Sequence, residues 1–132
     1  MVDNQRQRNL DVVRRAFAGI AAGDASQMLD GNYTDDVVIE FPYASPPTRI
    51  ETLEAARAYL EKAFEVFRFR LEITDVYEGL DPDLLVLEFT SEGRMLSTGA
   101  PYGNRYIAVY RFRDGRISHQ REFYNPVAAS SR

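Results

Sequence analysis

The pattern of apolar and polar residues divides the chain into a helical first half and a strand-rich second half. Residues 5–22 are predicted to form an amphipathic helix, because apolar residues recur there at the spacing of one helix face, at Leu10, Val13, Phe17 and Ile20. Gly23 is suited to end this helix in a left-handed conformation. Asp24 begins a short second helix, with Gln27 placed for a capping box. A third amphipathic helix is predicted over about residues 52–67.

Strand patterns occur on both sides of the third helix. A turn at 33–36 precedes a short strand at 37–41. Alternation of apolar and polar residues predicts a strand that includes 69–74 and a long strand over about 84–97, followed by a loop at 99–104. Helices followed by an antiparallel sheet are typical of the α+β class. We therefore expect a cone-shaped α+β barrel, in which three N-terminal helices pack on a curved, mostly antiparallel sheet and leave a pocket beside the third helix.

The final stretch of the chain predicts a β-hairpin. Asp114 and Gly115 tolerate the positive φ angles of a two-residue turn. With this turn, Ile107 faces Glu122, and one face of the hairpin carries Ile107, Val109, Arg111, Ser118, Gln120, Glu122 and Tyr124. Both faces are substantially apolar, which a sheet with one solvated face does not need. We infer that one face lines the core and pocket, and that the other contacts a second copy of the chain.

Composition limits the class of protein. The chain has 132 residues, which suits a single domain over 1–126 with a flexible tail at 127–132. The formal net charge is -4 and no basic block occurs, so nucleic acid is not an expected partner. No apolar run is long enough to span a membrane, and no secretory signal is visible. With no cysteine in the sequence, we expect a cytoplasmic protein.

Three stretches of the sequence resemble one known superfamily. They are Thr34-Asp35-Asp36; Glu78 with Asp81-Pro82 and Glu88; and the final hairpin, through Asn104, Ile107, Gly115-Arg116-Ile117, Arg121-Glu122-Phe123 and Asn125-Pro126. They resemble the nuclear-transport-factor-2-like superfamily, which includes ketosteroid isomerase and the SnoaL-like polyketide cyclases. Within it, the chain is most similar to the phenazine-biosynthesis A/B-type proteins.

The resemblance implies a cone fold, a homodimer joined through the sheet, and a pocket acid or base at Glu122. It also implies that Glu40 lies near the position of the base of ketosteroid isomerase. The chain departs from the phenazine proteins at two positions. Tyr59 stands where they carry a pocket histidine on the long helix, and Met28 or Leu29 stands where they carry a substrate-binding arginine.

Candidate site residues follow from the hairpin and from the resemblance. Glu122 is a candidate general acid or base, because a carboxyl group desolvated among apolar neighbours titrates near neutral pH; alternatively, it forms a structural pair with a cation such as Arg105. Tyr59 is a candidate hydrogen-bond donor to a carbonyl, or a half-buried tyrosine that reaches water. Glu40 is a second catalytic candidate, although an outward-facing position is common for such a residue. The predicted substrate-binding residues are Tyr43, Phe67, Ile107, Gln120 and Tyr124.

Metal and cofactor chemistry are not expected. His119 is the sole histidine, and the spacing of carboxylates around it does not suggest a metal site. The leading functional hypothesis is an isomerase, cyclase or condensing enzyme that acts on a cyclic or aromatic biosynthetic intermediate. Two alternatives remain: a non-catalytic ligand-binding or accessory subunit, and an epoxide-type hydrolase. The hydrolase needs at least two polar groups that hold one water, from Glu40, Glu88 or Glu122.

Overall fold

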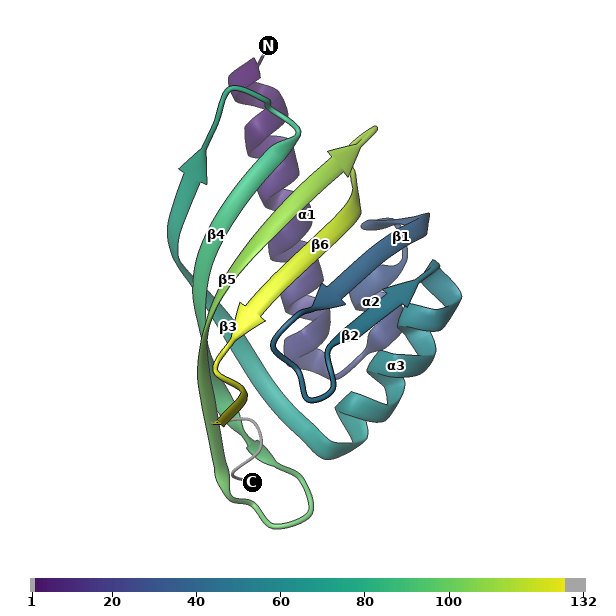
Figure 1. Ribbon diagram of the computed structural model, residues 1–132, viewed down its shortest axis with the longest axis vertical. Helices are drawn as coiled ribbons and strands as arrows, with labels where there is room; N and C mark the ends of the chain where they lie inside the picture. The colour runs from purple at the N-terminus through teal and green to yellow at the C-terminus, as the bar shows by residue number, and fades with distance from the viewer. Residues whose placement is uncertain (1, 128–132) are drawn as a thin grey trace.

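A six-stranded sheet curls around the helices without closing into a barrel (Figure 1). The structure is a computed structural model that describes residues 2–127. Its helices are α1 (Val2–Ala22), α2 (Ala25–Leu29) and α3 (Leu53–Val66). Its strands are β1 (Tyr33–Phe41), β2 (Thr48–Glu51), β3 (Phe67–Glu78), β4 (Leu84–Met95), β5 (Pro101–Arg113) and β6 (Arg116–Tyr124). The predicted α+β cone with a mostly antiparallel sheet is confirmed, although the curled sheet stays open.

The helices form where the apolar spacing predicts them. Val13 and Phe17 of α1 are buried against the sheet. Gly23 ends this helix at a φ of 67°, and its N–H donates to the carbonyl of Ile20 at 2.9 Å. Asp24 caps α2, because its carboxylate accepts from the backbone N–H of Gln27 at 3.0 Å. Figure 1 shows α1 behind the strands and α3 beside β1 and β2.

The strand order is β2-β1-β6-β5-β4-β3, so the first and last parts of the chain share one sheet. The pairing of β1 with β6 is parallel, and the other pairings are antiparallel. The predicted turn at 33–36 is instead the start of β1, where the pairing with β6 is irregular. The predicted loop at 99–104 is also wrong, since β5 begins at Pro101. Strand β2 has four residues, too few for a readable alternation.

The turn of the final hairpin is confirmed, but its register is not. Asp114 and Gly115 adopt φ angles of 53° and 78°. Beyond the turn, the pairing shifts by one residue at Ser118, which has no partner on β5, as in a β-bulge. Because side chains alternate between the faces of a strand, this one extra residue places every later residue of β6 on the opposite face relative to β5. As a result, Ile107 pairs with Phe123, and Glu122 pairs with Ala108.

The inner face of the hairpin therefore differs from the predicted one. It carries Gln120 and Glu122 together with residues predicted for the outer face: Tyr106, Ala108, Tyr110, Phe112 and Ile117 are all buried. These side chains and the apolar face of α1 belong to one hydrophobic core. Of the predicted tail, residues 128–132 lie outside the described residues. Within residues 2–127, no helix is both long and apolar enough to cross a membrane.

Candidate active site

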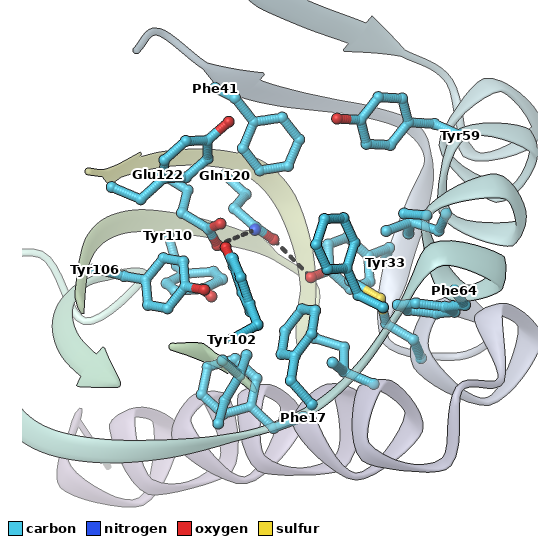
Figure 2. Close-up of a pocket in the computed structure, with 18 residues that line it drawn as sticks. Phe17, Tyr33, Phe41, Tyr59, Phe64, Tyr102, Tyr106, Tyr110, Gln120 and Glu122 are labelled. Atoms are coloured by element: carbon cyan, nitrogen blue, oxygen red, sulfur yellow. Dashed lines mark hydrogen bonds between the residues drawn. The ribbon is translucent and has the colours of Figure 1, made fainter. Parts of the chain in front are cut away.

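A cavity of about 170 Å³, partly open to solvent, lies between the helices and the concave face of the sheet (Figure 2). Eleven of its 18 lining residues are aromatic, so any molecule inside it is surrounded mainly by rings. An apolar cavity of about 150 Å³ in another protein is large enough to bind benzene. The volume therefore suits a compound with a single ring.

Glu122 provides the one carboxyl group among the described residues that line the cavity. Strand β6 directs it inward, opposite the fully buried Ala108. Burial raises the pKa of Glu122 from 4.5 to about 7, and a hydrogen bond from Gln120 partly opposes this rise. The side chain itself is only partly buried, because the cavity leaves some of its surface free. A carboxyl group that titrates near neutral pH can both accept and return a proton under physiological conditions.

A short relay of hydrogen bonds holds this carboxyl group (Figure 2). The hydroxyl of Tyr33, on β1, donates to Oε1 of Gln120 at 2.6 Å. The amide Nε2 of Gln120 then donates to Oε1 of Glu122 at 3.2 Å. Tyr33 and Gln120 are 2% and 4% exposed, so the bond between them is shielded from bulk water. Because the tyrosine hydroxyl occupies the amide oxygen, the amide nitrogen is left to face the carboxylate.

Several tyrosine hydroxyls surround the same cavity. Tyr59 extends from α3, and its ring stacks on Phe41 with 5.8 Å between ring centroids. Burial and the charge of Glu122 raise the pKa of Tyr59. Burial, followed by the effects of Tyr59 and Glu122, raises the pKa of Tyr124 to about 12. Both hydroxyls thus keep their protons at neutral pH and can donate hydrogen bonds to a ligand.

The cavity brings together five of the eight predicted site residues: Tyr59, Phe67, Gln120, Glu122 and Tyr124. Their roles remain predictions. The position predicted for Glu40 is wrong, because it lies on the outer face of the sheet. Its Oε2 is 2.5 Å from Nε2 of His119 and accepts from Arg121 at 3.2 Å. The hydrogen bond from His119, followed by those from Arg121, holds the pKa of Glu40 below its ordinary value, although partial burial opposes this.

Tyr43 and Ile107 are also placed outside the cavity. Tyr43 lies between β1 and β2, is 57% exposed, and contacts the ring of Phe123 edge-on with 5.2 Å between centroids. Ile107 is 42% exposed on the outer face, because the bulge at Ser118 moves it away from Glu122. Both residues line a shallow hollow on the outer face of the sheet.

Four cavity tyrosines were not predicted as site residues: Tyr33, Tyr102, Tyr106 and Tyr110. Tyr33 was assigned to a turn, and Tyr106 and Tyr110 to the outer face of the hairpin. The hydroxyl of Tyr106 donates to Oγ of Ser91 at 2.9 Å within the interior. The high tyrosine content, eight residues, was a signal that aromatic rings line a cavity, but it does not say which ones.

The described residues contain no group of three or more histidine, aspartate or glutamate side chains arranged to hold a metal ion. The lone histidine, His119, is bonded to Glu40 on the outer face, away from the cavity. The polar side chains that the described residues place in the cavity are Glu122, the Gln120 amide and the tyrosine hydroxyls.

The curled, open sheet and the cavity on its concave side define an α+β cone of the nuclear-transport-factor-2-like type. The chain belongs to the SnoaL-like domain family, which it matches over residues 13–120. It is 37% identical over 107 residues to a PhzA/B-like protein of Pseudomonas aeruginosa, covering 80% of this chain and 75% of that protein. The resemblance to phenazine-biosynthesis A/B-type proteins is thereby confirmed.

Two further similarities cover nearly the whole chain. The protein YesE of Bacillus subtilis is 29% identical over 130 residues, which are 96% of this chain and 88% of that protein. A solved structure named "Putative Isomerase from Bacillus subtilis" superposes with a TM-score of 0.89 at 28% identity, covering 96% of this chain and 93% of that chain.

Proposed function

We propose that this protein is a cofactor-independent isomerase, cyclase or condensing enzyme that acts on a small cyclic or aromatic biosynthetic intermediate. One observation carries the proposal: a single carboxyl group, Glu122, lies in a cavity lined mainly by aromatic rings, where burial brings its pKa to about 7. General acid–base catalysis is most efficient when the pKa of the catalytic group lies near the working pH. The isomerase name of the Bacillus subtilis structure supports the same reaction class.

The reaction begins with transfer of a proton from a ring carbon beside a carbonyl group to the carboxylate of Glu122. The electron pair of the broken C–H bond forms a C=C bond, and the π pair of the carbonyl group moves to its oxygen, which gives an enolate. The hydroxyl of Tyr59 stabilises this negative charge by donating a hydrogen bond, which strengthens as the charge develops. Where a ring C=C bond adjoins the deprotonated carbon, the charge extends along it, and Glu122 returns the proton to the far carbon of that conjugated system, which moves the double bond and completes an isomerisation. In a cyclisation or condensation, the enolate carbon instead attacks a second carbonyl carbon, and Glu122 protonates the new alkoxide.

The geometry does not favour the hydrolase alternative. An epoxide-type hydrolase needs two polar groups that grip one water, and Glu122 is the one carboxyl group among the described residues that line the cavity. Glu40 is bonded to His119 on the outer face. Glu88 accepts a hydrogen bond from the exposed Tyr77 at 2.6 Å and lines the outer hollow.

The proposed enzyme is a homodimer joined through the outer face of the sheet. Large apolar side chains are exposed on or beside this face at Ile107, Tyr77 and Tyr43. Phe123 lies next to Ile107 across the β5–β6 pairing and adds to the same surface. Clustered apolar groups of this size are characteristic of contact surfaces rather than of surfaces left in water.

A thermal-shift screen followed by a turnover assay tests the proposed function. Wild type, Glu122→Gln and the outer-face control Glu40→Gln are screened against single-ring ketones and phenols. A ligand that binds the native state raises the melting temperature. We expect Glu122→Gln to keep binding at least one hit but to lose its conversion, while Glu40→Gln converts it as wild type does. Binding without conversion by wild type across the ketones would instead indicate a ligand-binding or accessory subunit.

A further inference from the structure

The charges around the cavity are one-sided. Among the residues that the structure describes, its lining contains one carboxyl group, Glu122, and no lysine, arginine or histidine. The other polar groups there are neutral: the Gln120 amide and the tyrosine hydroxyls. Arg121, the neighbour of Glu122 in sequence, points to the opposite face and bonds to Glu40 at 3.2 Å. When Glu122 ionises, no described cation in the lining balances its charge, so a cationic ligand can do so.

The described hydrogen bond to Glu122 leaves other acceptor positions of its carboxylate for a cationic ligand. A carboxylate has two oxygens and about four positions that accept hydrogen bonds. The described donor to Glu122 is a single neutral amide, at 3.2 Å, on Oε1. A buried carboxylate without a charged partner is costly, and a cation that donates hydrogen bonds to it offsets much of that cost.

The aromatic rings of the cavity also favour a positively charged ligand. The faces of aromatic rings carry partial negative charge and attract cations within about 6 Å. Around Glu122, Phe41 lies between Tyr59 and Tyr124, with ring centroids 5.8 Å and 6.1 Å from its own. Figure 2 shows the labelled rings of Phe17, Tyr33 and Tyr102 on the other sides of the same space. A cation beside Glu122 would thus lie among aromatic rings as well as against the carboxylate.

We propose that the natural ligand is a single-ring compound that carries a protonated amine, which binds against the carboxylate of Glu122 inside the aromatic walls. This inference rests on the proposed function for the location of the site, and it adds the charge class of the substrate. The cavity rejects ring compounds that carry a carboxylate, because no described cation in its lining compensates a second negative charge. A neutral ring compound binds, but more weakly than the amine.

The test uses three probes that have the same ring and similar size but different charge: benzylamine, benzyl alcohol and benzoate. Their dissociation constants are measured by isothermal titration calorimetry at pH 8, where Glu122 is mostly ionised and an alkyl amine is protonated. We expect benzylamine to bind wild type at least about tenfold more tightly than benzyl alcohol, because close charge pairs in interfaces contribute coupling energies of at least that size. Benzoate is expected to bind more weakly than either.

Two variants separate the carboxylate from the aromatic walls. Glu122→Gln keeps the size of the side chain and can still accept from Gln120, and we expect it to bind benzylamine and benzyl alcohol equally. Glu40→Gln removes a carboxylate from the outer face and is expected to keep the wild-type preference for the amine. Melting temperatures of both variants verify that they are folded before binding is measured.

The preference also depends on pH. The described titratable groups that share the cavity with Glu122 are the tyrosines Tyr33, Tyr59, Tyr102, Tyr106, Tyr110 and Tyr124. A phenol ordinarily titrates at about pH 10, and burial raises the pKa values of Tyr33, Tyr59, Tyr106, Tyr110 and Tyr124. Between pH 6 and pH 8, Glu122 alone changes charge in the cavity. The affinity for benzylamine should therefore rise over this interval, and the affinity for benzyl alcohol should not.

Three results would overturn the inference: equal affinities of wild type for the amine and the alcohol, binding of benzoate as tight as that of benzylamine, or no binding by any probe. These results are distinguishable from failure of the proposed function. Conversion of a neutral ketone that is lost in Glu122→Gln, without a preference for the amine, refutes the amine inference alone. A strong preference for the amine without any turnover would refute the catalytic proposal alone.

Discussion

Replacing Glu122 by glutamine should make the protein more stable above neutral pH. The pKa of Glu122 is raised from 4.5 to about 7 in the folded protein. The folded state therefore holds this proton over a pH range in which the unfolded chain has released it. Because stability falls with pH wherever the folded state binds more protons, Glu122 reduces the free energy of unfolding as the pH rises from about 4.5 to about 7.

The magnitude follows from the same pKa values. Each pKa unit corresponds to about 1.4 kcal/mol, so the ionised Glu122 costs the folded state about 3 kcal/mol at pH 8. Glutamine has the same shape, can accept the hydrogen bond from Gln120 and carries no charge. We expect Glu122→Gln to exceed wild type by about 3 kcal/mol at pH 8, or ~10 °C in melting temperature, and to differ little at pH 4.5.

The assay is urea denaturation of both proteins at intervals from pH 4.5 to pH 8.5, followed by circular dichroism. The difference between the two proteins isolates this residue from the other titrating groups. A difference that does not change with pH would refute the reasoning, because Glu122 would then have an ordinary pKa in the folded protein. A variant that becomes less stable than wild type as the pH rises would refute it as well.

Three other substitutions test separate parts of the structure. Glu40→Gln should have the opposite pH dependence. Because the pKa of Glu40 is lowered in the folded protein, the ionised Glu40 stabilises the fold above about pH 4.5. The difference in the free energy of unfolding from wild type, measured by urea denaturation, should vanish as acid protonates Glu40. Tyr33→Phe removes the hydroxyl that holds the Gln120 amide and should cost about 1–3 kcal/mol in the free energy of unfolding. The pKa of Glu122, measured by ¹³C NMR, should rise in this variant. An unchanged pKa of Glu122 would show that the Tyr33 hydroxyl does not orient the amide. Ile107→Arg should convert the proposed dimer to a monomer in light scattering at unchanged circular dichroism, whereas a monomeric wild type would refute the dimer.

Much of the fold could be predicted from the sequence, because its signals are local. The apolar stripe of α1, the end of that helix at Gly23 and the turn at Asp114-Gly115 each depend on a few neighbouring residues. The resemblance of the chain to the SnoaL-like proteins supplied the curled sheet, which no local pattern specifies. Strand β2 was missed because four residues carry too little periodicity to distinguish a strand from a loop.

The site was predictable only in part, because one bulge decides which side chains enter the cavity. Ser118 is an ordinary strand residue, and nothing in the sequence around it indicates an unpaired position. Without the bulge, Ile107 appears to face Glu122, and Tyr106 and Tyr110 appear to point outward. Gln120, Glu122 and Tyr124 were placed correctly on one face, because they follow the bulge and alternate with one another.

The most direct test of the central claim follows the proton itself. Single-ring ketones, with and without an amino group on the ring, are incubated with the protein in D₂O at neutral pH, and loss of the proton signal beside the carbonyl is followed by NMR. The account predicts that wild type and Glu40→Gln accelerate exchange of at least one such ketone and that Glu122→Gln does not. Exchange that continues unchanged in Glu122→Gln, or no acceleration by wild type for any ketone that binds, would contradict the claim that Glu122 moves protons in this cavity.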